Sequence, residues 1–251
     1  MPIDWFILAP AAFFAGLVDA VVGGGGLIQI PVLLSAFPQV PIPMLFGTNK
    51  VSSIAGTGAA LWRYAHSLTI PWKLMLFATL TALVGAWGGA AVVALLPREA
   101  MKPLVVLMLV AVATYTFWRK DLGHAETHEP RPRDPWLAAL FGLVIGFYDG
   151  FFGPGTGSFL IFGFVRVFGM NFVRASASAK LINLATNLSA IIFFASHGPI
   201  LWGVGLTMAV CNLLGSQVGT HLALKHGTRF VRHAFLVVVV VLIAKQVIDF
   251  F

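Results

Sequence analysis

Four ionisable residues lie within otherwise apolar stretches of the sequence: Asp19, Lys50, Asp149 and Lys180. In a membrane segment a central charge costs about 2.5–3.5 kcal/mol on insertion scales, so each of them needs a reason. One reason is structural, with each Asp pairing with a Lys to hold the molecule together. The other is functional: the lysines attract an anion, while Asp19 and Asp149 are coupling groups for a proton or cation, or counter-ions that keep an empty site neutral. The sequence leaves both interpretations open.

Two glycine clusters follow the aspartates closely, at 23–26 (Gly-Gly-Gly-Gly) and 153–157 (Gly-Pro-Gly-Thr-Gly). A helix does not run smoothly through so many glycines or past Pro154. We therefore expect each cluster to separate two helices, so that free backbone N–H groups and the positive end of a helix dipole form an anion site. The residues that would open the two half-helices are Gly25, Gly26, Gly155, Thr156 and Gly157.

Hydroxyl and amide side chains flank both lysines, several at a spacing that shares a helix face with them. They could donate hydrogen bonds to a sulfonate, a sulfite or a carboxylate. They could equally form ordinary hydrogen bonds between helices, worth about 0.6 kcal/mol each in membranes. The predicted site members are Thr48, Asn49 and Ser53 beside Lys50, and Ser178 and Asn183 beside Lys180.

Other kinds of site find little support in the residues. The seven histidines have no metal-ligand spacing, and the single cysteine, Cys211, cannot form an intrachain disulfide. The glycine runs lack the Lys-Ser/Thr of a phosphate-binding loop. We therefore expect no catalytic residue, no metal and no cofactor, and a protein that is not an enzyme. A membrane enzyme or assembly factor is the weakest alternative.

The composition indicates an all-α integral membrane protein with the lipid bilayer as its surroundings. Of the 251 residues, 59% are hydrophobic and only 10% are charged, whereas soluble domains carry about 25% charged residues. Runs such as 72–96 and 199–224 are nearly free of charge and are longer than the roughly 20 residues that a membrane-spanning helix needs. The net charge of +7 then suits cytoplasmic loops rather than nucleic acid.

The sequence repeats itself after 130 positions without a gap. Asp19 falls on Asp149, Lys50 on Lys180 and Trp72 on Trp202, together with several glycines. Because Asp, Lys and Trp are rare in this chain, their coincidence indicates a duplicated unit. We predict a first transmembrane repeat at 1–118, a hydrophilic linker at 119–135 and a second repeat at 136–251, called the first and second halves below.

Each half is predicted to contain five helical segments. The second of each is too short to span a bilayer, so with the first it forms a glycine-broken hairpin. The expected segments are Trp5–Val22, 27–37, 44–64, 71–96 and 101–118 in the first half, and 136–152, 158–168, 171–196, 199–225 and 229–250 in the second.

The distribution of Lys and Arg favours two inverted repeats. If each hairpin enters and leaves on one side, eleven of the sixteen lie on one side and three on the other, with Lys50 and Lys180 inside the membrane. A parallel repeat would divide the loop charges almost evenly. The positive-inside rule therefore predicts a cytoplasmic linker and both termini outside.

The residues around the clusters resemble the sulfite exporter TauE/SafE family, and most closely its YfcA-like branch. The resemblance covers essentially the whole chain and is carried by GLVDAVVGGGGLIQIP, GTNKVSS, GFYDGFFGPGTGSFL and ASAKLIN. It implies a multi-pass inner-membrane transporter for sulfite, sulfoacetate and related sulfur-containing or organic anions. The halves differ where Asn49 corresponds to Ala179 and Gly26 to Thr156, so we expect an asymmetric site.

Together these features predict an inner-membrane secondary transporter, with export as the expected direction, for a small organic or sulfur-containing anion such as a sulfonate or sulfite. One inverted half would rock against the other to give alternating access, with H⁺ or Na⁺ as a possible coupling ion. The alternative is an anion channel whose pore is lined by the two broken hairpins.

Overall fold

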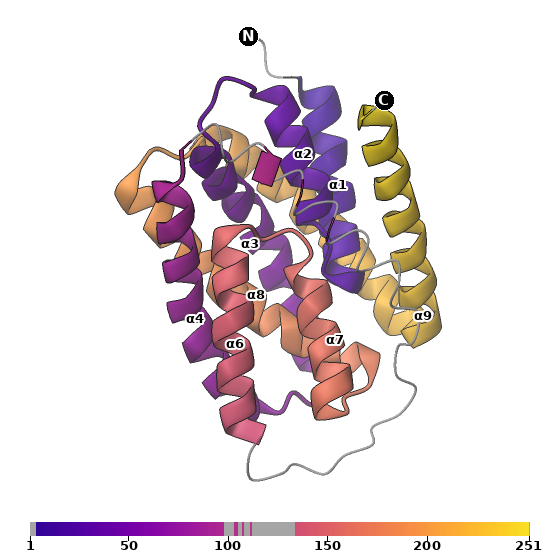
Figure 1. Cartoon of the computed structure of the whole chain (residues 1–251). Helices are drawn as coiled ribbons and strands as arrows, with labels where there is room; N and C mark the ends of the chain where they lie inside the picture. Colours follow the sequence, from indigo (N-terminus) through magenta and orange to yellow (C-terminus); the bar gives the residue numbers. More distant parts are fainter. Residues whose placement is uncertain (1–3, 98–102, 105–106, 108–110, 112–133, 251) are drawn as a thin grey trace.

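The computed structural model describes residues 4–97, 103–104, 107, 111 and 134–250, with side chains as far as Gly227. All regular secondary structure in these residues is helical. The helices are α1 (Trp5–Val22), α2 (Gly26–Ala36), α3 (Ile42–Ser67), α4 (Trp72–Leu95), α6 (Asp134–Phe151), α7 (Thr156–Phe168), α8 (Phe172–His197) and α9 (Trp202–Phe250). The predicted all-helical class is confirmed (Figure 1).

The predicted segments match these helices with boundaries shifted by a few residues at most. Two predicted segments, 199–225 and 229–250, correspond to the single helix α9, which begins three residues later than predicted. Gly227 between them has non-helical backbone angles of φ 66° and ψ −160°. The predicted helix at 101–118 and the linker at 119–135 lie almost wholly outside the described residues.

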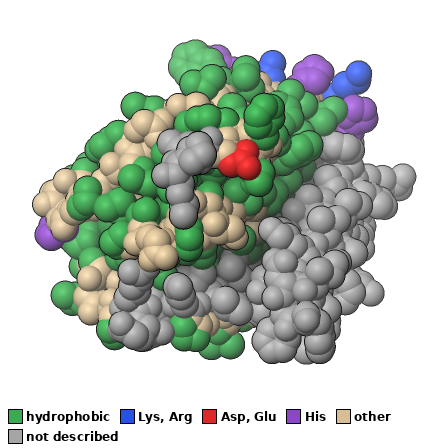
Figure 2. All heavy atoms as spheres, turned by 90° about the horizontal axis from the view of Figure 1, so that it is seen from above, with side chains coloured by type: hydrophobic (Ala, Val, Ile, Leu, Met, Phe, Trp, Pro, Cys, Tyr) green, Lys and Arg blue, Asp and Glu red, His purple; other side chains and the backbone are tan. Residues whose placement is uncertain are grey.

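The outer surface of the molecule is apolar, and polar side chains are buried among apolar ones in the interior. Large hydrophobic side chains project outward, including Leu76, Leu80 and Val84 on α4 and Leu140 and Val144 on α6. Figure 2 shows this on one face, where hydrophobic side chains predominate and few charged ones appear. Among the described residues, α1, α4 and α8 are long and apolar enough to cross a membrane, while α2 and α7 are apolar but shorter. A hydrocarbon environment explains this polarity, because lipid rather than water meets the outer surface.

Glycines bring the outer helices into close contact. The helix α1 packs on α9, and α4 packs on α6. A Cβ on Gly16 of α1 would meet the backbone of Asn212, and one on Gly85 of α4 would meet the backbone of Leu143 and Phe147. Small residues allow such close approach between membrane helices.

The helices α3 and α8 lie in the interior and carry most of the buried polar side chains. In Figure 1, α1 starts at the upper end of the molecule and α6 starts at the lower end. The short helices α2 and α7 return toward the ends from which α1 and α6 came, so the α1–α2 and α6–α7 connections both lie near the middle of the molecule.

Candidate functional site

Glycine backbone geometry ends the first helix of each half. The helix α1 stops at Val22, where Gly23 caps it with a φ of 79° and donates its N–H to the main-chain oxygen of Asp19. In the second cluster Gly153 and Gly155 have φ values of 92° and 81°. Residues with a Cβ rarely adopt these angles. The helices then restart at Gly26 and at Thr156.

The two glycine clusters touch each other. A Cβ on Gly23 would overlap the backbone of Gly157, and the reverse is also true, so only glycine fits at either position. A Cβ on Gly26 would lie 3.1 Å from the Cα of Pro154. The hydroxyl of Ser158 donates to the main-chain oxygen of Val22 at 2.9 Å. Backbone contacts therefore join the two breaks in the interior.

The four buried charges form two ion pairs, and each pair joins one half to the other. Lys50 Nζ lies 2.8 Å from Asp149 Oδ1, and Lys180 Nζ lies 2.7 Å from Asp19 Oδ2. Lys180 also donates to the main-chain oxygen of Asp19. Shifting one pair by 130 positions gives the other, so the pairing follows the repeat. Such pairs are costly to break, because a single buried charge left behind costs about 3–5 kcal/mol.

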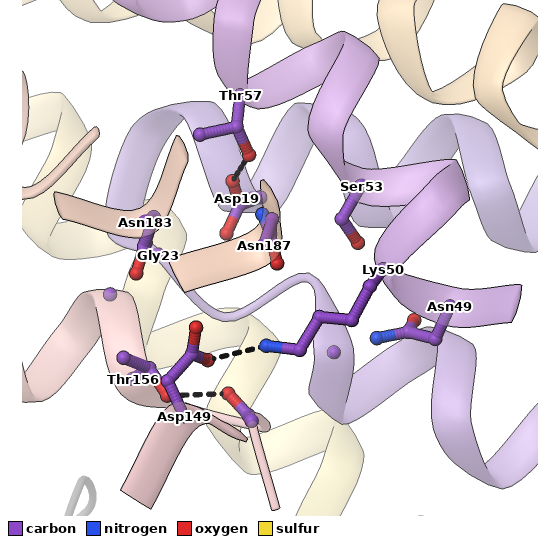
Figure 3. Close-up of a pocket in the computed structure, with 13 residues that line it drawn as sticks. Asp19, Gly23, Asn49, Lys50, Ser53, Thr57, Asp149, Thr156, Asn183 and Asn187 are labelled. Carbon is purple, nitrogen blue, oxygen red and sulfur yellow. Dashed lines mark hydrogen bonds and ion pairs between the residues drawn. The ribbon is translucent and has the colours of Figure 1, made fainter. Parts of the chain in front are cut away.

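A small polar cavity lies between the clusters (Figure 3). Its volume of about 30 Å³ has room for about two water molecules. The residues that line it come from both halves: Asp19, Gly23, Gly26, Asn49, Lys50, Ser53, Thr57, Asp149, Gly153, Thr156, Gly157, Asn183 and Asn187. Five pairs in this set are related by the shift of 130, so the cavity is shared nearly equally between the halves.

Nine of the predicted site residues line this cavity: Asp19, Gly26, Asn49, Lys50, Ser53, Asp149, Thr156, Gly157 and Asn183. The other five lie elsewhere. Gly25 and Gly155 precede α2 and α7 as their caps. Lys180 is fully buried behind Asp19, to which it is bonded.

The remaining two, Thr48 and Ser178, make local bonds away from the cavity. The Thr48 hydroxyl donates to Met44 O at 2.8 Å and accepts from the N–H of Leu201 at 3.1 Å. The Ser178 hydroxyl donates to the sulfur of Met170. Each residue precedes its lysine by two positions, which is a rotation of about 200° around a helix.

Four lining residues were not among the predicted site members: Gly23, Thr57, Gly153 and Asn187. Thr57 and Asn187 carry a signal that could have revealed them. Each lies four residues after a predicted member, Ser53 or Asn183, and so lies on the same helix face. The 130-residue shift also superimposes Thr57 on Asn187, and Gly23 on Gly153.

Several polar atoms around the cavity are already engaged. The Thr57 hydroxyl donates to Asp19 Oδ2 at 3.4 Å, and the Thr156 hydroxyl donates to Gly153 O at 2.7 Å. The Ser53 hydroxyl donates to Gln29 Oε1 at 3.2 Å. Gln29 in turn donates to Ser52 at 2.6 Å, which links α2 to α3. These bonds fix the walls of the cavity.

Three buried oxygens in the lining have no hydrogen-bond partner: Asn49 Oδ1, Asp149 Oδ2 and Asn183 Oδ1. A buried unpaired acceptor costs about 1–3 kcal/mol, so we expect water or a ligand in the cavity to donate to these three oxygens. An amide can turn to present either its oxygen or its N–H₂, whereas a carboxylate can only accept.

The groups around the cavity are polar and their charges are balanced. The two lysines and two aspartates around it sum to zero net charge. Within the described part of the chain, no group of three or more His, Cys, Asp or Glu side chains could hold a metal ion. The available groups are one ammonium, one carboxylate oxygen and two amides, which together can bind a small ion.

Comparison with known proteins finds the family that the sequence motifs resemble, and the match covers nearly the full length of the chain. Residues 8–246 match the model of the family described as "Sulfite exporter TauE/SafE". The chain is 35% identical over 239 residues to "Probable membrane transporter protein ORF9" of Sinorhizobium sp, covering 95% of this chain and 90% of that protein.

Other relatives have similar names. "Probable membrane transporter protein YfcA" of Escherichia coli (strain K12) is 30% identical over 243 residues, covering 97% of this chain and 89% of the relative. A "Probable membrane transporter protein" of Haemophilus influenzae is 32% identical over 247 residues, covering 97% and 94%. No solved structure matches the chain significantly. The apolar helices and these matches agree with the motifs at the glycine clusters, and the chain belongs to the sulfite exporter TauE/SafE family of membrane transporters.

Proposed function

We propose that this protein is a secondary transporter of a small organic or sulfur-containing anion, such as a sulfonate or sulfite, and that the cavity between the glycine clusters is its binding site. The proposal rests on two ion pairs at the cavity, Lys50–Asp149 and Lys180–Asp19. Each of them joins one half of the molecule to the other. An anion that competes for Lys50 would weaken a link between the halves. Binding would thereby be coupled to their relative movement.

Two inverted halves that move by alternating access are the arrangement we propose for the whole molecule. In support, α1 and α6 enter from opposite ends in Figure 1. The first helix of each half also packs on the fourth helix of the other half, α1 on α9 and α6 on α4. Transporters with inverted repeats and broken helices bind their substrates near the midplane, at the breaks.

The size of the cavity favours a carrier over a channel. Its volume of about 30 Å³ suits about two waters, so a sulfite or sulfonate needs the walls to separate. Those walls are held by the contact between Gly23 and Gly157 and by the two ion pairs. Ion conduction through an open pore would not require such interactions to break and re-form with each anion.

An inner-membrane location with a cytoplasmic linker and both termini outside completes the proposal. Arg63 and Lys73 lie on either side of the α3–α4 connection, and Arg166 and Arg174 on either side of the α7–α8 connection. Both connections are at the lower end of Figure 1. The start of α1 and the end of α9 are at the opposite, upper end. This clustering of positive charge supports the lower end as cytoplasmic.

The proposal is tested by flux in proteoliposomes containing the purified protein. We expect uptake of radiolabelled sulfite or methanesulfonate to saturate, and to accelerate when unlabelled anion is present on the far side. A bound anion should also raise the melting temperature by mass action. Flux that grows without saturation would favour the channel instead.

Lys50→Ala tests the site itself. The variant removes the ammonium that faces the cavity and should reduce uptake at least tenfold, since a hydrogen bond to a charged group contributes about 1.5–3 kcal/mol. Lys73→Ala is the matched control, because Lys73 is an exposed residue at the start of α4. Equal uptake by a folded Lys50→Ala variant and the control would refute the site.

A further inference from the structure

The two ion pairs occupy equivalent positions in the repeat but differ in how completely they are satisfied. Asp19 Oδ2 accepts from both Lys180 and Thr57, and Lys180 makes a further bond to the Asp19 main chain. Asp149 accepts from Lys50 through Oδ1 only, and its Oδ2 is buried without a partner. The residue equivalent to Thr57 is Asn187, and in the described structure Asp149 Oδ2 receives no hydrogen bond from it.

An incoming anion would meet this free carboxylate oxygen directly. Asp149 lines the cavity together with Asn49 and Asn183, whose amide oxygens are also unpaired. Water satisfies such acceptors because it donates hydrogen bonds, but an anion brings only further acceptors. The two amides can turn their N–H₂ groups toward an anion. Asp149 can become a donor only by binding a proton.

We propose that Asp149 is the proton-binding residue of transport and takes up one proton from solvent as an anion binds, an inference that rests on the proposed function. The proton attaches to Oδ2, and the neutral carboxyl then donates to the anion. The ammonium of Lys50 leaves the neutral carboxyl and pairs with the anion. Two Lys and two Asp sum to zero, and one anion with one proton keeps that sum unchanged.

The charged groups around Asp149 are consistent with this role. Lys50 faces it from α3, Asp19 lines the same cavity from α1, and Lys180 of α8 is held by Asp19. On its own helix the neighbouring Tyr148 hydroxyl donates to Pro154 O at 2.6 Å. Among the described residues, α2, α4, α7 and α9 add no ionisable side chain to the cavity lining.

A proton fits this site better than Na⁺. The ammonium of Lys50 lies 2.8 Å from the other oxygen of the same carboxylate, so a second free cation would be repelled at short range. A metal cation would also need the amide oxygens of Asn49 and Asn183 as ligands. Amide oxygens turned toward a cation would point the N–H₂ groups away from that position. Proton binding uses one oxygen and leaves both amides for the substrate.

The first test measures binding by the wild-type protein in detergent. Methanesulfonate keeps a single charge across the neutral pH range, so its own titration does not interfere. We expect its affinity to fall as pH rises, by up to about tenfold per pH unit, which is the slope for one linked proton. A pH indicator should report one proton taken up per anion bound, with no change when K⁺ replaces Na⁺. A flat pH profile without proton uptake, or a requirement for Na⁺, would overturn the proposal.

The second test uses Asp149→Asn, which resembles the protonated carboxyl and can still accept from Lys50. In proteoliposomes this variant should exchange methanesulfonate without accumulating it in response to a pH gradient, whereas the wild type accumulates it. The matched variant Asp19→Asn alters the other pair; its absolute affinity can change, but that affinity should still fall as pH rises. Accumulation driven by pH in Asp149→Asn would contradict the assignment. If Asp149→Asn does not fold, the pH dependence of anion affinity and the proton uptake of the wild-type protein decide whether a proton binds with the anion.

The two proposals fail in different ways. A wild-type protein that neither binds nor exchanges methanesulfonate, sulfite or sulfate would refute the proposed function. A wild-type protein that exchanges one of these anions, with an affinity independent of pH and no proton uptake, would refute only the role of Asp149.

Discussion

Lys50 and Lys180 occupy equivalent positions in the repeat but have different surroundings. Lys50 faces the cavity, whereas Lys180 is fully buried and bonded to both the side chain and the main chain of Asp19. The first pair is thus placed to exchange partners with a ligand, and the second to hold α1 against α8. The structural and functional interpretations of the buried charges are compatible, because each can apply to a different pair.

Lys180→Met should destabilise the protein strongly. It leaves Asp19 as an uncompensated charge, which costs about 3–5 kcal/mol when a buried pair is broken. The double variant Asp19→Asn, Lys180→Met removes both charges and should recover most of that loss. Thermal unfolding in detergent measures both effects. A double variant as unstable as the single one would show that the unpaired charge of Asp19 is not the cause of the loss.

The sequence was sufficient to identify all four charges and most of the cavity lining. It could not decide their partners, because Asp19 could pair with Lys50 in its own half or with Lys180 in the other. That choice depends on how α1 packs against α8, which is a tertiary contact. Thr48 and Ser178 were included because they are close to the lysines in sequence, but the turn of the helix directs them away from the cavity.

At the scale of helices, glycine and proline determine where segments end, and these signals are local. The boundaries of α1, α2 and α7 could therefore be predicted closely. The partners of the helices could not, since stripes of small residues fit many neighbours equally well. Only the structure pairs α1 with α9 and α4 with α6.

Gly23→Ala should abolish transport and lower stability. Gly23 has a φ of 79°, and a Cβ there would overlap the backbone of Gly157. The unfavourable backbone conformation alone costs about 1–3 kcal/mol. Gly24→Ala is the adjacent control, because its Cβ would meet only the side chains of Leu27 and Val18 at 3.6 Å. Melting temperature and anion uptake should separate the two variants, and similar behaviour would argue against a tight contact between the clusters.

At the scale of the molecule, the proposed proton coupling bears on the direction of transport. A proton that travels with the anion would let the inward proton gradient of a bacterial inner membrane drive uptake. The protein would then export the anion only when the outward gradient of the anion is larger than the inward gradient of the proton. The export expected from the family resemblance would in this case be driven by the anion itself, and proteoliposomes with imposed gradients can distinguish the two regimes.

The ion pairs between the halves also have a consequence for how the protein is made. The first half is synthesised before the second, so Asp19 and Lys50 enter the membrane before Asp149 and Lys180 exist. Until then the nascent chain carries two charges without their final partners, at a cost of about 2.5–3.5 kcal/mol each in the bilayer centre. On this reasoning only the completed chain would hold all four charges in ion pairs.

We expect chains ending or beginning within the linker at 119–135 to be degraded when either half is expressed alone. Co-expression should restore both, because each half supplies the counter-charges of the other. Pulse-chase measurement of the two fragments, separately and together, tests this expectation, and a first half that is equally long-lived alone would contradict it. Arrival of the second half would then protect the first from membrane proteases.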